Sequence, residues 1–463
     1  MESLPSLETV FEALNALFHN PDTTGKEKAS VWLGELQRSV FAWQISDQLL
    51  QLNRDVESCY FAAQTMRTKI QYAFHELPQD SWESLRDSLM NHCMKITQDT
   101  PHAITTQLCL ALADLALQMS TWKGAASDLM QKFGNDVTHW HFLLELITVL
   151  PEEINSRSLR LGANRRNEVT EELVECCPVM VHLLTAILES GSTNSHLEAK
   201  VFRCLGSWFS VYAVPESVII NSKLLSSPFD ALRNKDCESH LHEAATDCIC
   251  AALYASEDIT RNPTLVQALI QGVLTLLDPY HMSVATEDLD KSINYCRVFT
   301  EMAESLLDAI LSSPNQGFGD LTTLELLLTC VGHHQYEVAE ITFNFWYRLS
   351  EILYQRNEKP VDDIFKPYVQ RLIVSLCKHC EYDSDHMFEA LKASSTSWTA
   401  SESALYVMTA VAKNIIRKPR SGALKEPVLL PYGCLSVFGR GEGGPWTWLS
   451  ISDSRQLIYT CDI

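Results

Sequence analysis

The feature that most constrains this chain is an apolar helical pattern that recurs along most of its length. Apolar residues follow the i, i+3, i+4, i+7 rule in stretches centred near residues 64, 113, 146, 205, 247, 299 and 344. The mean interval of about 47 residues is at the long end for HEAT or armadillo units. Neither helix of such a pair buries its apolar face alone, so neighbouring units must stack. We therefore predict an all-α, HEAT/armadillo-type helical-repeat solenoid.

Glycine and proline support this prediction because both are scarce. The chain has 17 of each in 463 residues, which favours long helices with short connections. Several prolines fall where turns between helices are expected, as at Pro21, Pro151 and Pro367. A TPR array is a weaker alternative, because the interval is too long and no W-x2-L-G-x2-Y pattern occurs.

The pattern divides the chain into three parts. Residues 1–72 hold the first repeats and residues 73–418 continue the solenoid. Residues 419–463 are rich in Gly, Pro and Trp and have no helical period. We expect this last segment to be a separate, disordered tail.

Charge and cysteine content limit the classes of function. The net charge of −22 opposes binding to phosphate backbones, so we expect no direct nucleic-acid partner. It suits attraction to basic protein segments, and simple solubility is the alternative. No apolar run is long enough to span a membrane, and the N-terminus lacks the pattern of a signal peptide. The 15 Cys lie mostly on apolar faces, so we expect reduced thiols in an intracellular protein.

Nothing in the sequence points to catalysis or to a cofactor. No P-loop, G-x-S-x-G or H-E-x-x-H motif occurs. Cys377, His379 and Cys380 with His386 contain one C-x-x-C without a second half at metal spacing. We therefore predict a protein that is not an enzyme, has no cofactor and binds no metal.

Two helices carry candidate partner-binding residues. In the helix expected over 55–72, the face opposite the apolar one holds Glu57, Phe61, Gln64 and Thr68. A phenylalanine at the centre of a polar face favours contact with a partner, and packing against the adjacent repeat is the alternative. The helix over 107–119 is apolar nearly all round except for a stripe that includes Asp114, which would continue the same inner surface.

A short basic stretch is the third candidate. It contains four arginines and no acid within ten residues: Arg157, Arg160, Arg165 and Arg166. In an acidic protein such a stretch can meet an acidic partner through bidentate contacts. Pairing with the flanking glutamates is an equally good interpretation.

The N-terminal residues also match a known pattern. A helix ending in Leu36-Gln37 precedes one with Trp43, Ile45 and Leu49-Leu50, and Ala62-Ala63 follows. This resembles the N-terminal domain of the importin-β family. The segments WLGELQRSVFAWQISDQLLQ, SRSLRLGANRR, KVFRCLGSW and FNFWYRL resemble the transportins of that family that carry Ser/Arg-rich splicing factors. The resemblance covers about residues 7–416.

The resemblance implies a nuclear import receptor that binds cargo in the cytoplasm and releases it to Ran–GTP in the nucleus. It implies Ran–GTP, Ser/Arg-rich splicing factors and nucleoporins as partners, with shuttling between nucleus and cytoplasm and contact with the nuclear envelope. The candidate residues above would then contact Ran. The chain departs from the family pattern between Cys380 and Trp398 and beyond about residue 418, and such receptors are roughly twice as long. We thus expect a truncated form. The alternative is a static HEAT-repeat scaffold without a Ran cycle.

Overall fold

The computed structural model describes residues 3–191, 194–356, 358–380, 435–440, 446–452 and 455–460. They fall into two compact units, Met1–Gly319 and Asp320–Ile463, each described separately below. The helices of the first unit are α1 (Leu7–His19), α2 (Thr23–Arg38), α3 (Ala42–Leu52), α4 (Val56–Ala73), α5 (Trp82–Met94), α6 (His102–Gln118), α7 (Ala125–Phe133), α8 (Trp140–Ile154), α9 (Ala163–Glu189), α10 (Ser195–Ser210), α11 (Glu216–Ile219), α12 (Lys223–Arg233), α13 (Ser239–Ala255), α14 (Pro263–Leu274), α15 (Leu277–Ala285), α16 (Leu289–Ser305) and α17 (Leu307–Ser312). Short 3-10 turns lie at Phe74–Glu76, Gln79–Ser81, Val137–His139 and Gly317–Gly319.

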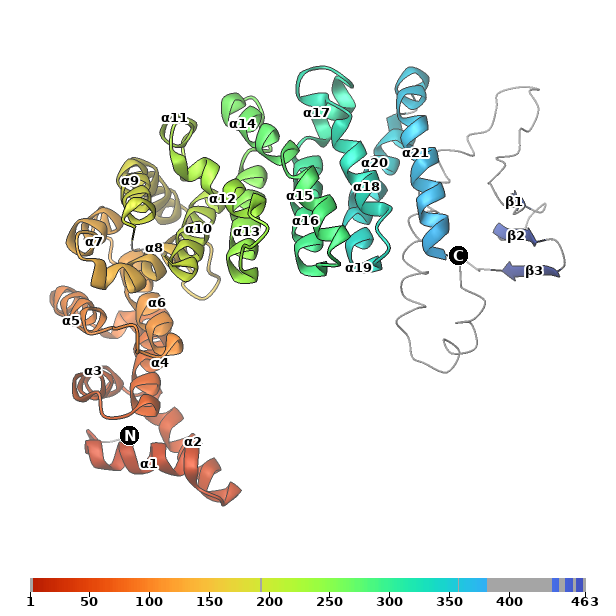
Figure 1. The fold of residues 1–463 in the computed structure, drawn as a ribbon. Helices are drawn as coiled ribbons and strands as arrows, with labels where there is room; N and C mark the ends of the chain where they lie inside the picture. The colour runs from red at the N-terminus through yellow and green to blue at the C-terminus, as the bar shows by residue number, and fades with distance from the viewer. Residues whose placement is uncertain are drawn as a thin grey trace. The chain divides into compact units, whose positions relative to one another are not determined.

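Six helices of the first unit pack side by side in one row: α4, α6, α8, α10, α13 and α16 (Figure 1). Neighbours in this row run in the same direction. Ser195 at the start of α10 donates a hydrogen bond to Glu238, just before α13, and Gly206 further along α10 lies against Cys248 further along α13. The row helices lie at the positions where the sequence placed its strongest periodicity, so the helical-repeat prediction is confirmed, and this unit is all-α in its described residues.

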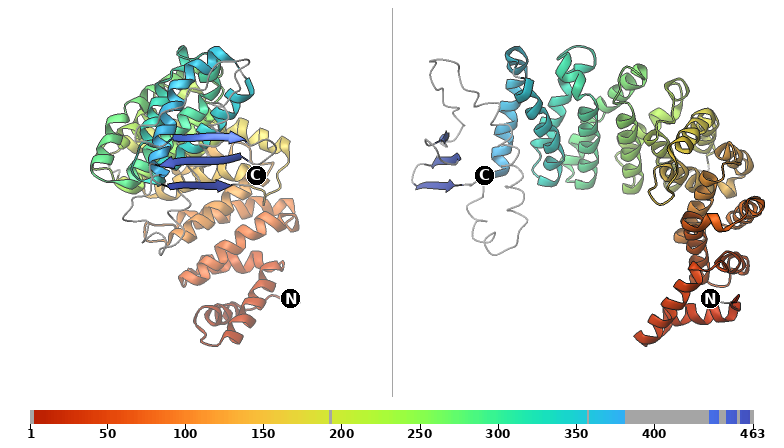
Figure 2. Two further views of the ribbon diagram at one scale, coloured as in Figure 1. Left: turned by 90° about the vertical axis from the view of Figure 1, so that its right-hand side faces the viewer. Right: turned by 180° about the vertical axis from the view of Figure 1, so that it is seen from behind.

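A second layer of helices covers one side of this row. α3 packs on α4, α5 on α6, α7 on α8, α12 on α13 and α15 on α16, so five of the six row helices are the second member of a helix pair. Figure 2 shows the same stack from two further sides. The core lies between the two layers and contains the bulky side chains Trp208, Phe142, Phe202 and Phe299, all less than 2% exposed. Stacked pairs of this kind bury a continuous core that no single pair could form.

Side-chain caps start several row helices. The Asp55 carboxylate accepts from the Ser58 backbone N–H at 2.7 Å before α4, and the Asn194 amide oxygen accepts from the Leu197 N–H at 2.8 Å before α10. The Asp288 carboxylate accepts from the Lys291 N–H at 3.1 Å before α16. Each cap satisfies a backbone donor that has no partner within the helix and fixes where the helix begins.

Two prolines that the sequence placed in turns lie inside helices. Pro151 is in the last turn of α8, and Pro367 is within α21. A proline inside a helix removes the hydrogen bond to the carbonyl four residues earlier. For Pro151 that carbonyl belongs to Ile147, and the indole N–H of Trp208 in α10 donates to it at 2.9 Å. The next repeat thus supplies the missing donor, and α8 continues to Ile154.

The second unit contains α18 (Thr322–Val331), α19 (Tyr336–Ala339), a 3-10 turn (Glu340–Thr342), α20 (Phe343–Arg356) and α21 (Lys359–Cys380). Three strands follow, β1 (Leu435–Arg440), β2 (Trp446–Ser452) and β3 (Arg455–Thr460), in one antiparallel sheet of order β1-β2-β3. Phe438 pairs with Trp448, and Trp448 pairs with Tyr459. The strands lie in the segment where the sequence showed no helical period. The helix expected over 405–416 lies outside the described residues, and the disorder of residues 419–463 stays a prediction.

Candidate protein-interaction site

The polar face predicted for α4 is only partly exposed. Gln64 is exposed, and Glu57 and Thr68 are half-buried, as a partner-binding face requires. Phe61, however, is 7% exposed and belongs to the core. α4 packs against α1, α2, α3 and α6, so its buried arc is wider than one apolar stripe. The prediction of Phe61 as a surface anchor is therefore wrong, and the alternative that it packs within the repeats describes it better.

Asp114 is also buried and supports the row from inside. It is 0% exposed, and its Oδ2 lies 3.4 Å from the Arg67 Nε. The Arg67 Nη2 donates to the Glu153 Oε1 at 3.1 Å. One guanidinium from α4 is thus shared by carboxylates from α6 and α8, and it links three successive repeats. The prediction of Asp114 as a surface residue is wrong because α6 is flanked by α4, α5 and α8.

This cluster holds two carboxyl groups and one guanidinium in a largely buried place. Burial, and after it the nearby Glu153, raise the pKa of the Asp114 carboxyl to about 8, and Arg67 opposes both effects. Asp114 Oδ1 and Glu153 Oε2 are buried and accept no hydrogen bond from described residues. Sequence reasoning missed Arg67 and Glu153. The sequence held one indication of this cluster: Asp114 is the single acid in an otherwise apolar helix, and a buried acid needs a cationic or hydrogen-bonding partner.

The four arginines of the basic stretch have different roles. Arg165 lies in the first turn of α9 and closes the end of α6: its guanidinium donates to the carbonyls of Leu117 at 3.0 Å and Ala116 at 3.2 Å. It also donates to Glu168 at 2.8 Å. Arg165 therefore follows the alternative of intramolecular pairing, because it satisfies carbonyls that have no partner within α6.

The other three arginines face solvent. Arg157 and Arg160 are exposed in the loop between α8 and α9, and Arg166 is half-buried. None of the three has an ion-pair partner among the described residues. Arg160 has a φ of 51°, in the left-handed region that side chains seldom adopt. The Arg67–Glu153 contact joins the α4 face to the end of α8, four residues before Arg157. The solvent-accessible part of the predicted site is thus Glu57, Gln64 and Thr68 on α4, with Arg157, Arg160 and Arg166 after α8.

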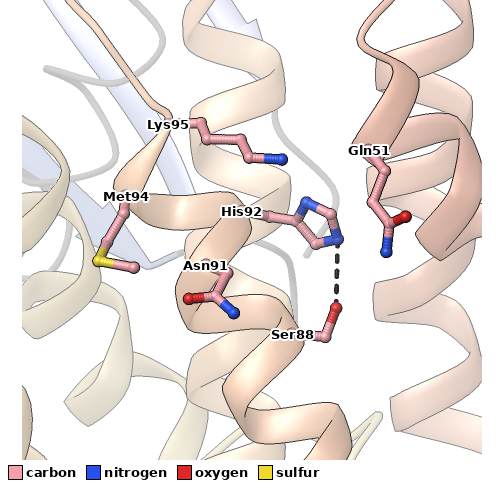
Figure 3. Close-up of a pocket in the computed structure, with 6 residues that line it drawn as sticks. All are labelled: Gln51, Ser88, Asn91, His92, Met94 and Lys95. Carbon is pink, nitrogen blue, oxygen red and sulfur yellow. Dashed lines mark hydrogen bonds between the residues drawn. The ribbon is translucent and has the colours of Figure 1, made fainter.

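A separate depression lies between α3 and the end of α5. It measures about 550 Å3 and is lined by Gln51, Ser88, Asn91, His92, Met94 and Lys95 (Figure 3). Beside it, Asp47 Oδ1 lies 2.8 Å from His92 Nε2, and Ser88 lies 3.3 Å from the same nitrogen. Ser88 also donates to Asp47. The hydrogen bond from His92 lowers the pKa of Asp47, against a smaller effect of burial.

This Ser–His–Asp cluster does not have the geometry of a nucleophilic triad. In a triad the acid binds one ring nitrogen and the nucleophile binds the other. Here both Asp47 and Ser88 face Nε2, and Nδ1 is buried without a partner among the described residues. No proton path from Ser88 to Asp47 through the ring exists in this arrangement. The cluster instead ties α3 to α5.

The cysteines of the described residues do not form a reactive or metal-binding site. Cys93 and Cys204 are buried thiols whose pKa burial raises to about 12. The described residues contain no cluster of three or more His, Cys, Asp or Glu suited to a metal ion. The side chains of Cys377, His379 and Cys380, and His386, lie outside the described part. No described helix has the length and apolar character needed to cross a membrane.

Comparison with known proteins gives three family models in order along the chain. Residues 29–95 match the importin-beta N-terminal domain, and residues 101–249 match the exportin 1-like protein family. Residues 287–379 match the second TPR domain of transportin-3 and importin-13. The TPR named in this description is, like the predicted HEAT unit, a repeat built from pairs of helices.

Individual relatives agree with these models. Importin-13 of Homo sapiens is 29% identical over 399 residues, which cover 83% of this chain and 40% of that protein. Transportin MOS14 of Arabidopsis thaliana is 28% identical over 412 residues, 83% of this chain and 41% of that protein. The chain thus spans about two fifths of the length of the curated relatives it matches.

Solved structures agree on the fold. The structure titled "Importin13 cytosolic state" is similar with a TM-score of 0.55 and 16% identity, covering 73% of this chain and 42% of that one. An N-terminal domain model, a repeat-domain model of the transportin-3 and importin-13 type and the stacked helix pairs agree with one another. By these three findings the chain is similar to the importin-β family, and within it to importin-13 and the transportins.

Proposed function

We propose that this chain acts as a nuclear import receptor of the karyopherin-β type that binds Ran–GTP. The observation that carries the proposal is the polar face of α4, where Gln64 is exposed and Thr68 half-buried, together with the free arginines Arg157 and Arg160 in the loop after α8. Arg67 of α4 connects the two through its contact with Glu153 at the end of α8. A row of parallel second helices presents this face as one surface over several repeats. Similarity to the importin-β family supports Ran–GTP as the partner, because the matched N-terminal domain is named for importin-β.

Within the proposed Ran site, the residues divide into contacts and supports. Glu57, Gln64 and Thr68, with Arg157, Arg160 and Arg166, would contact Ran. Phe61, Asp114 and Arg165 are buried or paired and hold the helices that carry the contacts. Exposed arginines at an interface mainly set the rate of association and the register of the partner.

We further propose Ser/Arg-rich splicing factors as cargo and nucleoporins as transport partners, with shuttling between nucleus and cytoplasm through the nuclear envelope. Similarity to Transportin MOS14 and importin-13 supports this wider role. Release of cargo by Ran requires that each ligand changes the other's affinity through the stacked repeats. The alternative, a static scaffold, has no such coupling and would not distinguish the nucleotide state of Ran.

The test is the affinity of the purified chain for Ran loaded with a non-hydrolysable GTP analogue and for Ran–GDP. We expect binding to the GTP form at least about tenfold tighter, which is about 1.4 kcal/mol. Equal affinities, or no binding to either form, would favour the scaffold.

A variant pair locates the site in the same assay. Arg157→Ser with Arg160→Ser should weaken binding of the GTP form about tenfold, because two interface arginines are lost. Lys235→Ser, which removes an exposed cation far along the chain, should leave the affinity unchanged. If the GTP preference stays and both variants bind like the parent, the function holds and the assigned contacts are wrong.

A further inference from the structure

The loop over residues 155–162 has a defined backbone although it contains no helix or strand. It joins α8 to α9 and carries Arg157 and Arg160, which are two of the proposed Ran contacts. Between them, Leu159 is only 6% exposed and packs into the core. Arg160 turns the chain with a φ of 51°. A buried leucine thus anchors the loop at its centre, and the two arginines beside it stay exposed.

The start of α9, which ends this loop, is not fixed by its own sequence. α9 is 27 residues long, yet its N-cap residue Gly162 provides no side-chain cap. Its first four residues contain no acid and two arginines, Arg165 and Arg166. Positive side chains are unfavourable there, because the amino end of a helix carries partial positive charge. Another part of the chain must therefore hold this helix end in place.

The Arg165 side chain reaches the opposite kind of helix end. Its Nε donates to the Leu117 carbonyl at 3.0 Å, and its Nη2 donates to the carbonyls of Ala116 at 3.2 Å and Met119 at 3.4 Å. The last carbonyls of α6 have no donor within the helix and carry partial negative charge. One guanidinium, only 14% exposed, thus joins the amino end of α9 to the carboxyl end of α6.

Two glutamates further along α9 complete this attachment. Glu168 accepts from Arg165 Nη1 at 2.8 Å and also pairs with Lys123. Glu172 lies 3.6 Å from Arg165, and its Oε2 accepts from the Gly124 N–H at 3.0 Å. Gly124 begins α7 in the left-handed region, with a φ of 64°. Three side chains of α9 therefore bind the turn between α6 and α7.

We infer that Arg165 is a positioning residue, which fixes the start of α9 and thereby holds the 155–162 loop in the conformation that presents Arg157 and Arg160. Where it concerns Ran, this inference rests on the proposed function. A guanidinium suits the role because its planar fork of five donors serves three carbonyls and a carboxylate at once. A loop that already has its bound conformation loses less freedom when a partner arrives.

The role of Arg165 differs from that of the arginines in the loop. Arg157 and Arg160 are exposed and have no ion-pair partner among the described residues, whereas the donors of Arg165 are used within the chain. Loss of Arg165 would leave the loop in its competent conformation for only a fraction of the time. The apparent affinity for a partner of the loop falls in proportion to that fraction.

The first test is hydrogen exchange of the free chain, in the parent and in Arg165→Gln. Residues 155–162 and the first turns of α9 should exchange at least about tenfold faster in the variant, while α10 and α13 stay unchanged. The milder Arg165→Lys should accelerate the same segment less, because an ammonium lacks the fork. Unchanged exchange in this segment, or equal acceleration from α6 to α13, would overturn the positioning role.

The matched control for this test is Arg233→Gln. Arg233 also links two segments, because its Nη1 donates to Thr275 at 3.0 Å while its Nη2 pairs with Asp230 in α12. Its loss should leave exchange in residues 155–162 as it is in the parent. Acceleration of that loop by Arg233→Gln would mean that the loop responds to any lost link between helices, and the specific role of Arg165 would be wrong.

The second test is binding to Ran loaded with a GTP analogue. Arg165→Gln should weaken binding about fivefold, mainly through a slower association rate. In the background of Arg157→Ser with Arg160→Ser it should have little further effect, because it acts through those two residues. Full additivity would make Arg165 a direct contact, and an unchanged affinity would show that its hold on the loop does not matter for binding. Either result would refute the inference.

The two tests separate this inference from the proposed function. The exchange measurement contains no Ran. If the parent binds neither nucleotide form of Ran, the proposed function fails, and exchange alone still decides whether Arg165 holds the loop. If the parent prefers Ran–GTP and exchange in residues 155–162 is the same in Arg165→Gln as in the parent, the function stands and the positioning role is wrong.

Discussion

The row of second helices uses charge in two different ways along its length. At the α4–α6–α8 end, Arg67 is shared between Asp114 and Glu153 inside the repeat stack. At the α10–α13–α16 end, Glu257 and Glu301 stand unpaired among the described residues, beside the exposed Tyr212 and Tyr254. The helices are parallel in both places and end at the same edge. Burial, rather than the number of acids, therefore decides whether acidic side chains at this edge pair within the repeats or stay exposed to solvent.

The largest effect expected from this comparison follows removal of the half-buried cation Arg67. Arg67→Ala leaves the Glu153 carboxylate without its counter-charge and the Asp114 carboxyl without its donor, and breaking a largely buried pair in this way costs about 3 kcal/mol. The apparent free energy of unfolding in urea at pH 7 should fall by that amount. Arg203→Ala removes an exposed arginine from α10 and should change it by less than about 0.5 kcal/mol. If both variants changed the free energy of unfolding by the same small amount, Arg67 would support the fold no more than the exposed Arg203 does.

The pH dependence of stability sharpens the same comparison. The folded pKa of Asp114 is about 8, well above that of an unfolded aspartate, so the folded state holds a proton that the unfolded state releases between about pH 4 and 8. The stabilisation is complete below the unfolded pKa and is lost as pH rises through the folded one, by up to a few kcal/mol.

Asp114→Asn removes this titration. The free energy of unfolding should then fall less steeply between about pH 5 and 9 than it does in the parent chain. Urea denaturation at several pH values measures the slope. A variant as steep as the parent would mean that Asp114 is ionised across this window and that Arg67 outweighs burial.

A smaller effect of opposite kind is expected at the exposed end. Tyr212→Asn places a residue that tolerates the left-handed region where a tyrosine stands now. Stability should stay unchanged or rise by up to about 1 kcal/mol, because the backbone strain at this position is relieved. Thermal melts decide the point. A clear loss of stability would show that Tyr212 supports the fold, as Arg67 does.

Much of the fold could be predicted from the sequence because apolar periodicity reports the buried face of each repeat. The row helices α4, α8, α13 and α16 lie where their periodic residues placed them. Pro151 could not be placed correctly, because the donor that replaces its missing N–H is Trp208 of the next repeat. Local sequence carries no information about such a distant partner.

The candidate site was less predictable for a related reason. A single helix wheel assigns one buried face, but α4 is packed by neighbours on several sides, and Phe61 lies within that wider arc. Asp114 looked like part of a surface stripe until Arg67 and Glu153 were found to share its surroundings. Arg165 and Arg157 looked alike in sequence, and only the position of the α6 carbonyls separates them.

We have proposed that the chain recognises Ran–GTP through the α4 face and the loop after α8. Hydrogen exchange of the backbone amides, measured with and without Ran loaded with a GTP analogue, tests this proposal most directly. We expect slower exchange in α4 and in residues 155–162 with the GTP form, and no change with Ran–GDP. Protection elsewhere with none in these two segments, or the same protection with both nucleotide forms, would contradict it.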